Sequence, residues 1–496
     1  MNPILHIALK DLTGLRWQAL LVLTLQLSYA ALLFRPRGVA GAGFAEIVLG
    51  WLIVATHFYF ISCAVHADAI PGDRQYWLTR PFTRTQLLAA KCLVAVCVVH
   101  VPLLLSDCLI LTGHQFNPLA YSGGLLWRQL LYLLAGTLPI LALSAVTRNL
   151  TQFALAAIVL IALLFILPSV LPWFSMNWGG LQWMKAVLNI LLAATGASAV
   201  LYLLYLRRKL PTAWAVLGAT AAIIPFSSDF TPFAAAFDVQ RRLHPRPPFQ
   251  ASIQFDPERL STFPSDRRVD ADRLTLTVPI RLENVPFNAA LHADSISATL
   301  RLPDGQSHPL RRRGSWSADL ATRAQWVFFP LERTLYEQFR DTNVTVDIRF
   351  YLTSFGTSRT YQMPAKSADP RPMGELGRCS SSPDLANIIV VSCFAPVHLP
   401  PRITAQMVDP KTGRPATRDT RLSEGFNYSP IPADRFQLSP IVQANSHFSI
   451  MSLPGQSKKS YSELLESNVQ FSVRDPRSHF TAALTVPSTP LRNLIR

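Results

Sequence analysis

The sequence predicts an α-helical multi-pass membrane domain followed by an all-β extracytoplasmic region of the immunoglobulin-like sandwich kind. Seven long apolar runs lie before residue 230, and runs of about 20 apolar residues are typical of helices that cross a membrane. Beyond residue 250, apolar and polar residues alternate, as they do in half-buried strands. We interpret the proline-rich stretch 235–250 as a stiff linker between the two regions.

The helical region is predicted to consist of a short amphipathic helix, 1–16, and a membrane domain, 17–234. Apolar residues recur at helical spacing in the first of these, so we expect it to lie along the membrane. The first long run resembles a signal peptide, but no small-residue cleavage site follows it, and we expect a retained helix. The predicted spans are 17–34, 47–65, 92–111, 130–146, 150–167, 186–206 and 210–226.

The charges of the loops predict the orientation in the inner membrane. With a cytoplasmic N-terminus, ten Lys and Arg residues fall on the cytoplasmic side and four on the outer side, as the positive-inside rule requires. Three arginines after the seventh run oppose this rule, but long translocated domains largely escape it. Seven crossings place loop 66–91 in the cytoplasm and the β region outside.

Loop 66–91 is the long polar interruption of the apolar first half. From residue 73 onward its apolar residues interleave with arginines, as in an amphipathic segment at a membrane surface that meets a soluble partner. The alternative is a solvated loop whose arginines only fix the topology. The candidate residues for contact with a partner are Asp73, Arg74, Trp77, Arg80 and Arg84.

The β region divides into two predicted modules, 251–365 and 366–496. Strict alternation at 274–282 and 344–352 marks strands of the first module, and a stretch rich in Pro, Gly and Ser, 358–384, separates it from the second. Modules of this size fit small sandwiches.

Six cysteines divide by location. Four lie in or beside apolar runs, which leaves Cys379 and Cys393 in the β region. An extracytoplasmic environment permits disulfides, so we expect these two to be bonded. The alternative is a pair of unrelated thiols in a cytoplasmic domain.

His100 and Asp107 are seven residues apart in the third predicted span and therefore share one helical face. Ionisable groups within a membrane often line a pathway, so both are candidates for a substrate path. The alternative is that Asp107 simply emerges near the outer surface.

The sequence carries no signature of catalysis. It has no phosphate-binding loop, no H-E-x-x-H and no G-x-S-x-G, and its C-terminal histidines lack the spacing of metal ligands. We therefore expect neither an enzyme nor a directly bound cofactor or metal. The net charge of +16 is divided evenly along the chain, which does not favour a nucleic-acid partner.

The run P-G-D-R-Q-Y-W-L-T-R-P-F-T-R-T-Q-L-L-A-A-K, which leads into the third span, resembles the permease subunits of type-2 ATP-binding-cassette (ABC-2) transporters. The residues that fit the family pattern are Gly72, Asp73, Leu78, Pro81, Arg84, Leu88 and Lys91. The likeness covers roughly the first 206 residues and includes a similar N-terminal elbow helix. The family's E-x-G-T-L-E run is replaced here, and a seventh span and a β region are added.

This resemblance implies an exporter permease whose energy comes from ATP bound by a separate ATPase subunit. It also implies a homodimer or a paired permease surrounded by membrane lipid. The rival prediction from the sequence is a membrane-anchored scaffold or binding protein of the cell envelope that transports nothing.

Overall fold

The computed structural model describes most of the chain. The described residues are 2–34, 44–68, 83–170, 181–227, 233–243, 249, 251–261, 274–286, 289–310, 318–319, 324–383, 388–397, 402–413, 420–421, 439–449 and 465–495.

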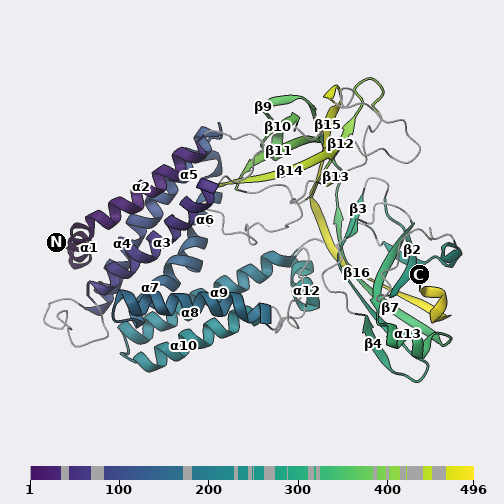
Figure 1. The fold of residues 1–496 in the computed structure, drawn as a ribbon, viewed down its shortest axis with the longest axis horizontal. Coiled ribbons are helices and arrows are strands. Elements are labelled where there is room, and N and C mark those ends of the chain that lie inside the picture. Colours follow the sequence, from purple (N-terminus) through teal and green to yellow (C-terminus); the bar gives the residue numbers. More distant parts are fainter. Residues whose placement is uncertain are drawn as a thin grey trace.

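The N-terminal half is helical, and its helices run back and forth between two ends (Figure 1). After the short helix α1 (Pro3–Gly14), each of the seven apolar runs lies in one helical rod of the described chain. The rods are α2 (Arg16–Leu33); α3 (Phe44–His66); α4 (Arg84–Ala95) with η2 (Val96–His100) and α5 (Val101–Gly113); η3 (Pro118–Tyr121) with α6 (Ser122–Tyr132), η4 (Leu133–Thr137) and α7 (Leu138–Val146); α8 (Leu150–Val170); α9 (Gln182–Tyr205); and α10 (Leu210–Ile223) with η7 (Ile224–Phe226).

Four helical stretches of the described chain are long and apolar enough to cross a membrane, which is consistent with a membrane protein. They are Phe44–His66, Arg84–Gly113, Pro118–Val146 and Trp183–Tyr205. Leu150–Leu163 and Leu210–Phe226 are apolar but shorter, and the 18-residue helix α2 is not among the four. Length and composition therefore support four of the seven predicted spans.

Two of the four stretches contain a π-helical turn directly before a proline. The turn η2 ends at His100, two residues before Pro102, and η4 ends at Thr137, two residues before Pro139. Proline has no N–H to donate, and a wider π turn absorbs the missing hydrogen bond without ending the helix. His100 and Thr137 thus occupy corresponding places in neighbouring stretches.

The linker predicted at 235–250 begins as a helix, α12 (Phe233–Leu243). This prediction was wrong for the first residues of the linker because the prolines start only at Pro245. The residues of α12 contain no helix breaker and are mostly good helix formers.

The C-terminal half forms antiparallel sheets, with short helices α13 (Arg333–Phe339), η8 (Pro257–Ser261), η9 (Gly374–Leu376) and η10 (Leu491–Leu494). A three-stranded sheet, β1-β2-β6, and a five-stranded sheet, β16-β7-β3-β4 with β5 beside β3, enclose one apolar core. Their strands are β1 (Ser252–Phe255), β2 (Leu274–Glu283), β3 (Ala290–Arg301), β4 (Ser307–Leu310), β5 (Ala318–Asp319), β6 (Ala324–Leu331), β7 (Asn343–Phe355) and β16 (Pro476–Pro490).

Two four-stranded sheets, β14-β11-β10-β9 and β13-β12-β15-β8, enclose a second core. Their strands are β8 (Arg359–Pro364), β9 (Ser367–Pro372), β10 (Arg378–Pro383), β11 (Ile388–Pro396), β12 (Arg402–Val408), β13 (Thr420–Arg421), β14 (Ile441–Ser449) and β15 (Asn468–Arg474).

The division into modules at residue 365 differs from the sheet pairing. Strand β8 pairs with β15 of the second module, whereas the C-terminal strand β16 returns to pair with β7 of the first. The second module is therefore inserted between β7 and β16. Alternation in the sequence marks a strand and its buried face, but it does not reveal the partner of that strand.

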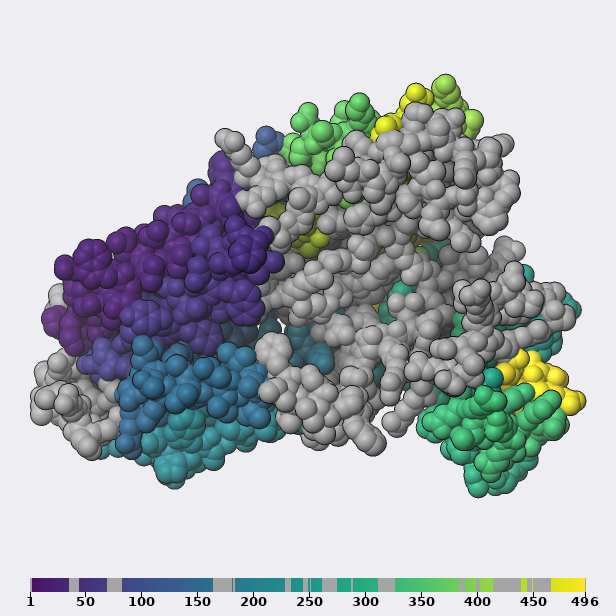
Figure 2. All heavy atoms as spheres, viewed as in Figure 1, coloured from purple at the N-terminus to yellow at the C-terminus, as the bar shows by residue number. Residues whose placement is uncertain are grey.

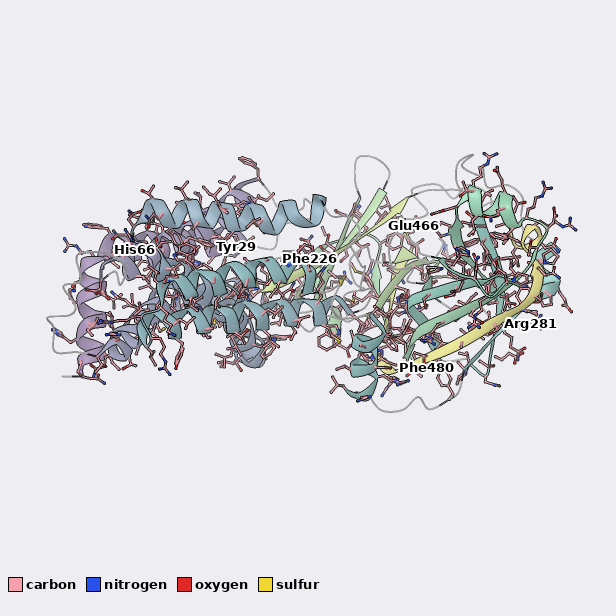
Figure 3. All side chains as sticks on the ribbon, turned by 90° about the horizontal axis from the view of Figure 1, so that it is seen from below. Tyr29, His66, Phe226, Arg281, Glu466 and Phe480 are labelled. Carbon is pink, nitrogen blue, oxygen red and sulfur yellow. A yellow bond between two sulfur atoms is a disulfide. The ribbon has the colours of Figure 1, made fainter. Side chains whose placement is uncertain are left out.

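The β region lies at one end of the helical region, and the N-terminus lies at the other (Figures 1 and 2). Figure 3 gives the direction, because His66 marks the end far from the sheets and Phe226 the end near them. At the near end, Phe394 and Ile441 of the β region pack in one apolar cluster with residues of the helices, which are Tyr29, Ala30, Ile53, Ile110, Leu111 and Leu125.

Candidate functional site

A buried lysine joins three separate parts of the chain at the end of the helical region far from the sheets. The side chain of Lys91 is 1% exposed, and its Nζ donates hydrogen bonds to Asp11 Oδ2 at 2.7 Å and Asp68 Oδ2 at 2.8 Å. Lys10 Nζ lies 3.6 Å from the other oxygen of Asp68. We call Lys91, Asp11 and Asp68 the lysine cluster.

Local sequence explains how each member is positioned. Helix α1 buries Ile7, Ala8 and Asp11. Asp11 follows Ile7 by four residues and Ala8 by three, so it lies on their face of the helix. Asn2 caps this helix by accepting a hydrogen bond from the backbone N–H of Ile4 at 3.0 Å. The carboxylate of Asp11 is thus carried into an apolar contact, where a buried charge requires a partner.

Two residues of the lysine cluster, Asp68 and Lys91, belong to loop 66–91 and lie on either side of segment 69–82. Asp68 is the last described residue before segment 69–82, and α4 begins directly after that segment. Thr83 starts α4 with a capping box, in which its Oγ1 accepts from the N–H of Gln86 and its own N–H donates to Gln86 Oε1 at 2.8 Å. Lys91 thus connects α4, which follows the segment, to Asp68, which precedes it.

Of the residues predicted to contact a partner, Arg84 is the first residue of α4 and is half-buried. Asp73, Arg74, Trp77 and Arg80 lie outside the described residues. The sequence marks Lys91 and Asp68 as charges of loop 66–91, and Lys91 also fits the family pattern, but no local signal pairs Lys91 with Asp11 and Asp68. The available signal was Asp11, a charged residue on the apolar face of a short helix.

A second charged cluster lies at the end near the sheets. Arg128 Nε is 3.2 Å from Asp107 Oδ2 and its second terminal nitrogen, Nη2, is 3.4 Å from Oδ1, while Gln129 Nε2 donates to Oδ2 at 3.3 Å. Asp107 is fully buried and Arg128 is 7% exposed. We call Asp107 and Arg128 the arginine cluster.

The predicted pair His100 and Asp107 belongs to one hydrogen-bonded network. His100 Nδ1 lies 3.1 Å from Gln129 Oε1, and Gln129 in turn donates to Asp107. His100 Nε2 lies 2.9 Å from Thr137 Oγ1, which links the two π-helical turns. The helical face shared by His100 and Asp107 therefore meets polar groups of the neighbouring rod.

The predicted fourth span begins at residue 130, which leaves Arg128 among the outer loop residues. The structure places Arg128 inside α6, within the stretch Pro118–Val146. The earlier start was missed because Arg128 interrupts the apolar run, and only the tertiary contact with Asp107 reveals why a charge is acceptable there.

The arginine cluster also contacts the β region. Arg128 Nη1 donates to the backbone oxygen of Ser439 at 2.6 Å, next to the start of β14. Close by, Val397 has φ of 67°, although a β-branched residue strongly disfavours positive φ. Its N–H donates to the oxygen of Pro440 at 2.8 Å, and its side chain fits against Gly124 of α6, where a Cβ would come within 3.0 Å. The β region is thus fitted closely to the helices.

The disulfide expected from the sequence is present in the β region, between β10 and β11. Cys379 and Cys393 face one another across β10 and β11 and are bonded through their sulfurs. Both are fully buried, and the neighbouring Phe394 packs against the ring of His114 at the end of α5, with ring centroids 5.9 Å apart. The bond joins β11, the strand that carries Phe394, to β10.

Among the residues that the structure describes, no group of three or more His, Cys, Asp and Glu side chains is placed to hold a metal ion. A comparison of the sequence with models of protein families and with curated proteins finds no match.

Proposed function

We propose that the chain is the membrane-spanning permease subunit of an ABC-type exporter, driven by a separate ATPase subunit. The observation that carries this proposal is the lysine cluster. One buried ammonium on α4 binds the carboxylates of Asp11 on α1 and of Asp68 just after α3, at the end of the helices opposite the β region.

The cluster supports a role in coupling because it makes three elements move together. Breaking a buried ion pair costs about 3–5 kcal/mol. A partner that pushes on segment 69–82 therefore displaces α1, α3 and α4 as one unit instead of distorting the segment alone. In the proposed exporter this partner is the ATPase. The ATPase binds the ATP, since this chain has no phosphate-binding loop of its own.

The same proposal places the segment in the cytoplasm, the β region outside it and the chain in the inner membrane as a homodimer or a paired permease. His100 and Asp107 then line the substrate path between the rods. The network through Gln129 supports this role because it forms a line of hydrogen-bonding groups between α5 and α6.

The test begins with purification from membranes in mild detergent and identification of the bound partners, in which we expect a cassette ATPase. Charge reversal at Asp73, Arg80 or Arg84 should then separate ATP hydrolysis from transport in the reconstituted complex while membrane insertion persists. Arg148→Glu is the matched control, because Arg148 is exposed at the same end of the helices. Normal coupling in all three reversal variants would refute the role of the segment.

A non-transporting envelope scaffold is the second candidate, and the close fit of the β region to the helices favours it. The contact from Arg128 to Ser439 would hold the β modules rigidly, as a fixed anchor requires. Absence of any ATPase from the purified protein would support the scaffold.

The orientation has its own test. Cys379 and Cys393 are buried, so the test uses a cysteine introduced at the exposed Asp304 in a chain whose four free cysteines are replaced. A membrane-impermeant thiol reagent applied to intact spheroplasts should label Asp304→Cys if the β region is outside. Labelling that requires lysis would exclude the exporter arrangement.

A further inference from the structure

Helix α12 lies where the first β module meets the helical region. Its buried face consists of Ala236, Phe237 and Gln240. The ring of Phe237 meets that of Tyr351 on β7 edge to face, with centroids 5.2 Å apart, and Gln240 Nε2 lies 3.0 Å from Nε2 of His479 on β16. These contacts fix α12 to the β module, so that its exposed side has a defined direction.

The position of α12 along the helical region is set by its contact with the beginning of α9. Leu181, which precedes α9, is fully buried in the same apolar cluster as Ala236 and Phe237, and Met184 packs against this cluster. The candidate span Trp183–Tyr205 starts at this point. Helix α12 is therefore level with the end of a candidate membrane span, where the interface between lipid and water lies if the span is inserted.

The exposed side of α12 carries an apolar face next to the buried one, and the exposed arginines follow around the helix. Ala235, Val239 and Leu243 follow one another at intervals of four residues and share this face. Val239 is 48% exposed and Leu243 is 69% exposed, and they are the exposed large apolar side chains of the described chain beyond α10. Arg241 and Arg242 are also exposed, and Arg241 pairs with Asp238 at 3.0 Å.

We propose that this face of α12 rests on an anionic phospholipid surface, with Val239 and Leu243 below the headgroups and the two arginines at the phosphates. An amphipathic helix with basic residues beside an apolar stripe is the usual form of such a contact, and each basic residue near an anionic surface adds about 1 kcal/mol. The inference uses the candidate span but does not depend on transport.

Two features favour lipid over a second copy of the chain or a soluble partner. The last apolar helix of the membrane region ends at Phe226, and α12 starts at Phe233, so the chain has only a few residues in which to leave the interface. The face also lies level with the start of α9. Through this contact the first β module is held at a fixed height above the membrane.

The experiment uses the full chain in phospholipid nanodiscs with a nitroxide label at Val239→Cys or Leu243→Cys. The free cysteines Cys63, Cys92, Cys97 and Cys108 are first replaced, and the disulfide is retained. Collision of the label with oxygen and with a water-soluble nickel complex is measured by power saturation of the electron paramagnetic resonance signal. We expect oxygen collisions to exceed nickel collisions at both sites in anionic nanodiscs.

Two control sites calibrate the result. A label at Leu191→Cys, which is 52% exposed within the candidate span Trp183–Tyr205, should report the hydrocarbon, and a label at Asp304→Cys, in the turn between β3 and β4, should report water. Nickel collisions at residues 239 and 243 equal to those at residue 304 would overturn the proposal. Protection from both reagents would also overturn it, because the face would then be covered by protein.

The role of charge is tested with Arg241→Gln and Arg242→Gln together. We expect the double variant to reduce the immersion of the label in anionic nanodiscs and to leave it unchanged in zwitterionic ones. An equal effect in both lipids would exclude recognition of the anionic headgroup.

Discussion

The lysine cluster and the arginine cluster place buried charges at opposite ends of the same helices, but they differ in composition and in reach. The lysine cluster has one cation for two carboxylates, and Lys91 donates to both. The arginine cluster has one cation and one carboxylate, and Arg128 also donates to a backbone oxygen 311 residues away in sequence. The first connects neighbouring parts of the helical region, whereas the second connects this region to the β sheets.

The difference shows how buried charge can serve two structural purposes. A cation shared by two anions resists the separation of either one, since each separation leaves a buried carboxylate without its partner. A guanidinium has several donors in a fixed plane, so Arg128 can satisfy Asp107 and still hold a carbonyl of another domain. The lysine cluster therefore holds helices to one another, and the arginine cluster holds the helices to the β region.

Loss of Lys91 should have the largest effect, because Lys91→Met leaves two buried carboxylates facing each other. We expect the free energy of unfolding to fall by about 3–5 kcal/mol, measured by denaturant unfolding of the detergent-solubilised protein. Adding Asp11→Asn and Asp68→Asn should recover most of this loss. A change below about 0.5 kcal/mol for Lys91→Met alone would show that the lysine cluster does not stabilise the helical region.

Loss of Arg128 should lower the stability almost as much and should also weaken the contact between the helices and the β region. Arg128→Met removes the cation beside Asp107, and we expect a loss of about 3 kcal/mol together with faster hydrogen exchange in β14. The double variant Arg128→Met with Asp107→Leu should recover stability but not the protection of β14. If exchange in β14 is unchanged in both variants, Arg128 does not hold the β region.

Asp294 is a buried carboxyl outside the helices, and it has no lysine or arginine partner comparable to those of the two clusters in the described contacts. Burial raises the pKa of Asp294 to about 6, against a hydrogen bond from Thr353 Oγ1 and the nearby charge of His292. The folded protein thus binds this proton more tightly than the unfolded chain, whose Asp pKa is about 3.9. Stability from this group is fully present below about pH 4 and is lost as the pH rises through about 6.

The variant Asp294→Asn removes this dependence. At pH 8 we expect it to be more stable than the original by up to about 3 kcal/mol, since one pKa unit corresponds to about 1.4 kcal/mol, and the advantage should vanish near pH 4. Urea unfolding at several pH values measures this difference. A pH-independent difference for Asp294→Asn would exclude the assignment.

The smallest effect on stability should come from Lys10, the exposed neighbour of the lysine cluster. Its side chain is 46% exposed, and its Nζ is 3.6 Å from Asp68. Exposed ion pairs contribute less than about 1 kcal/mol, so Lys10→Ala should cost little and only at low salt. A loss as large as that of Lys91→Met would mean that the burial of the cation is not what distinguishes the two lysines.

Sequence reasoning located the elements well where they depend on near neighbours. All seven apolar runs fall in helices, and the alternating stretches 274–282 and 344–352 fall in β2 and β7. It also related His100 to Asp107 by helical spacing, and both belong to one network. It placed Arg128 in a loop and divided the β region at residue 365, because both decisions depend on partners far away in the chain.

The sequence by itself determined which segments are helices and which are strands, and which face of each is apolar. These properties follow from the identities of residues two to four positions apart. The tertiary structure alone decided that Lys91 meets Asp11, 80 residues away, that Arg128 reaches Ser439, and that β16 returns to β7. Such pairings depend on how whole elements pack, and no local pattern records which distant group will satisfy a buried charge or a strand edge.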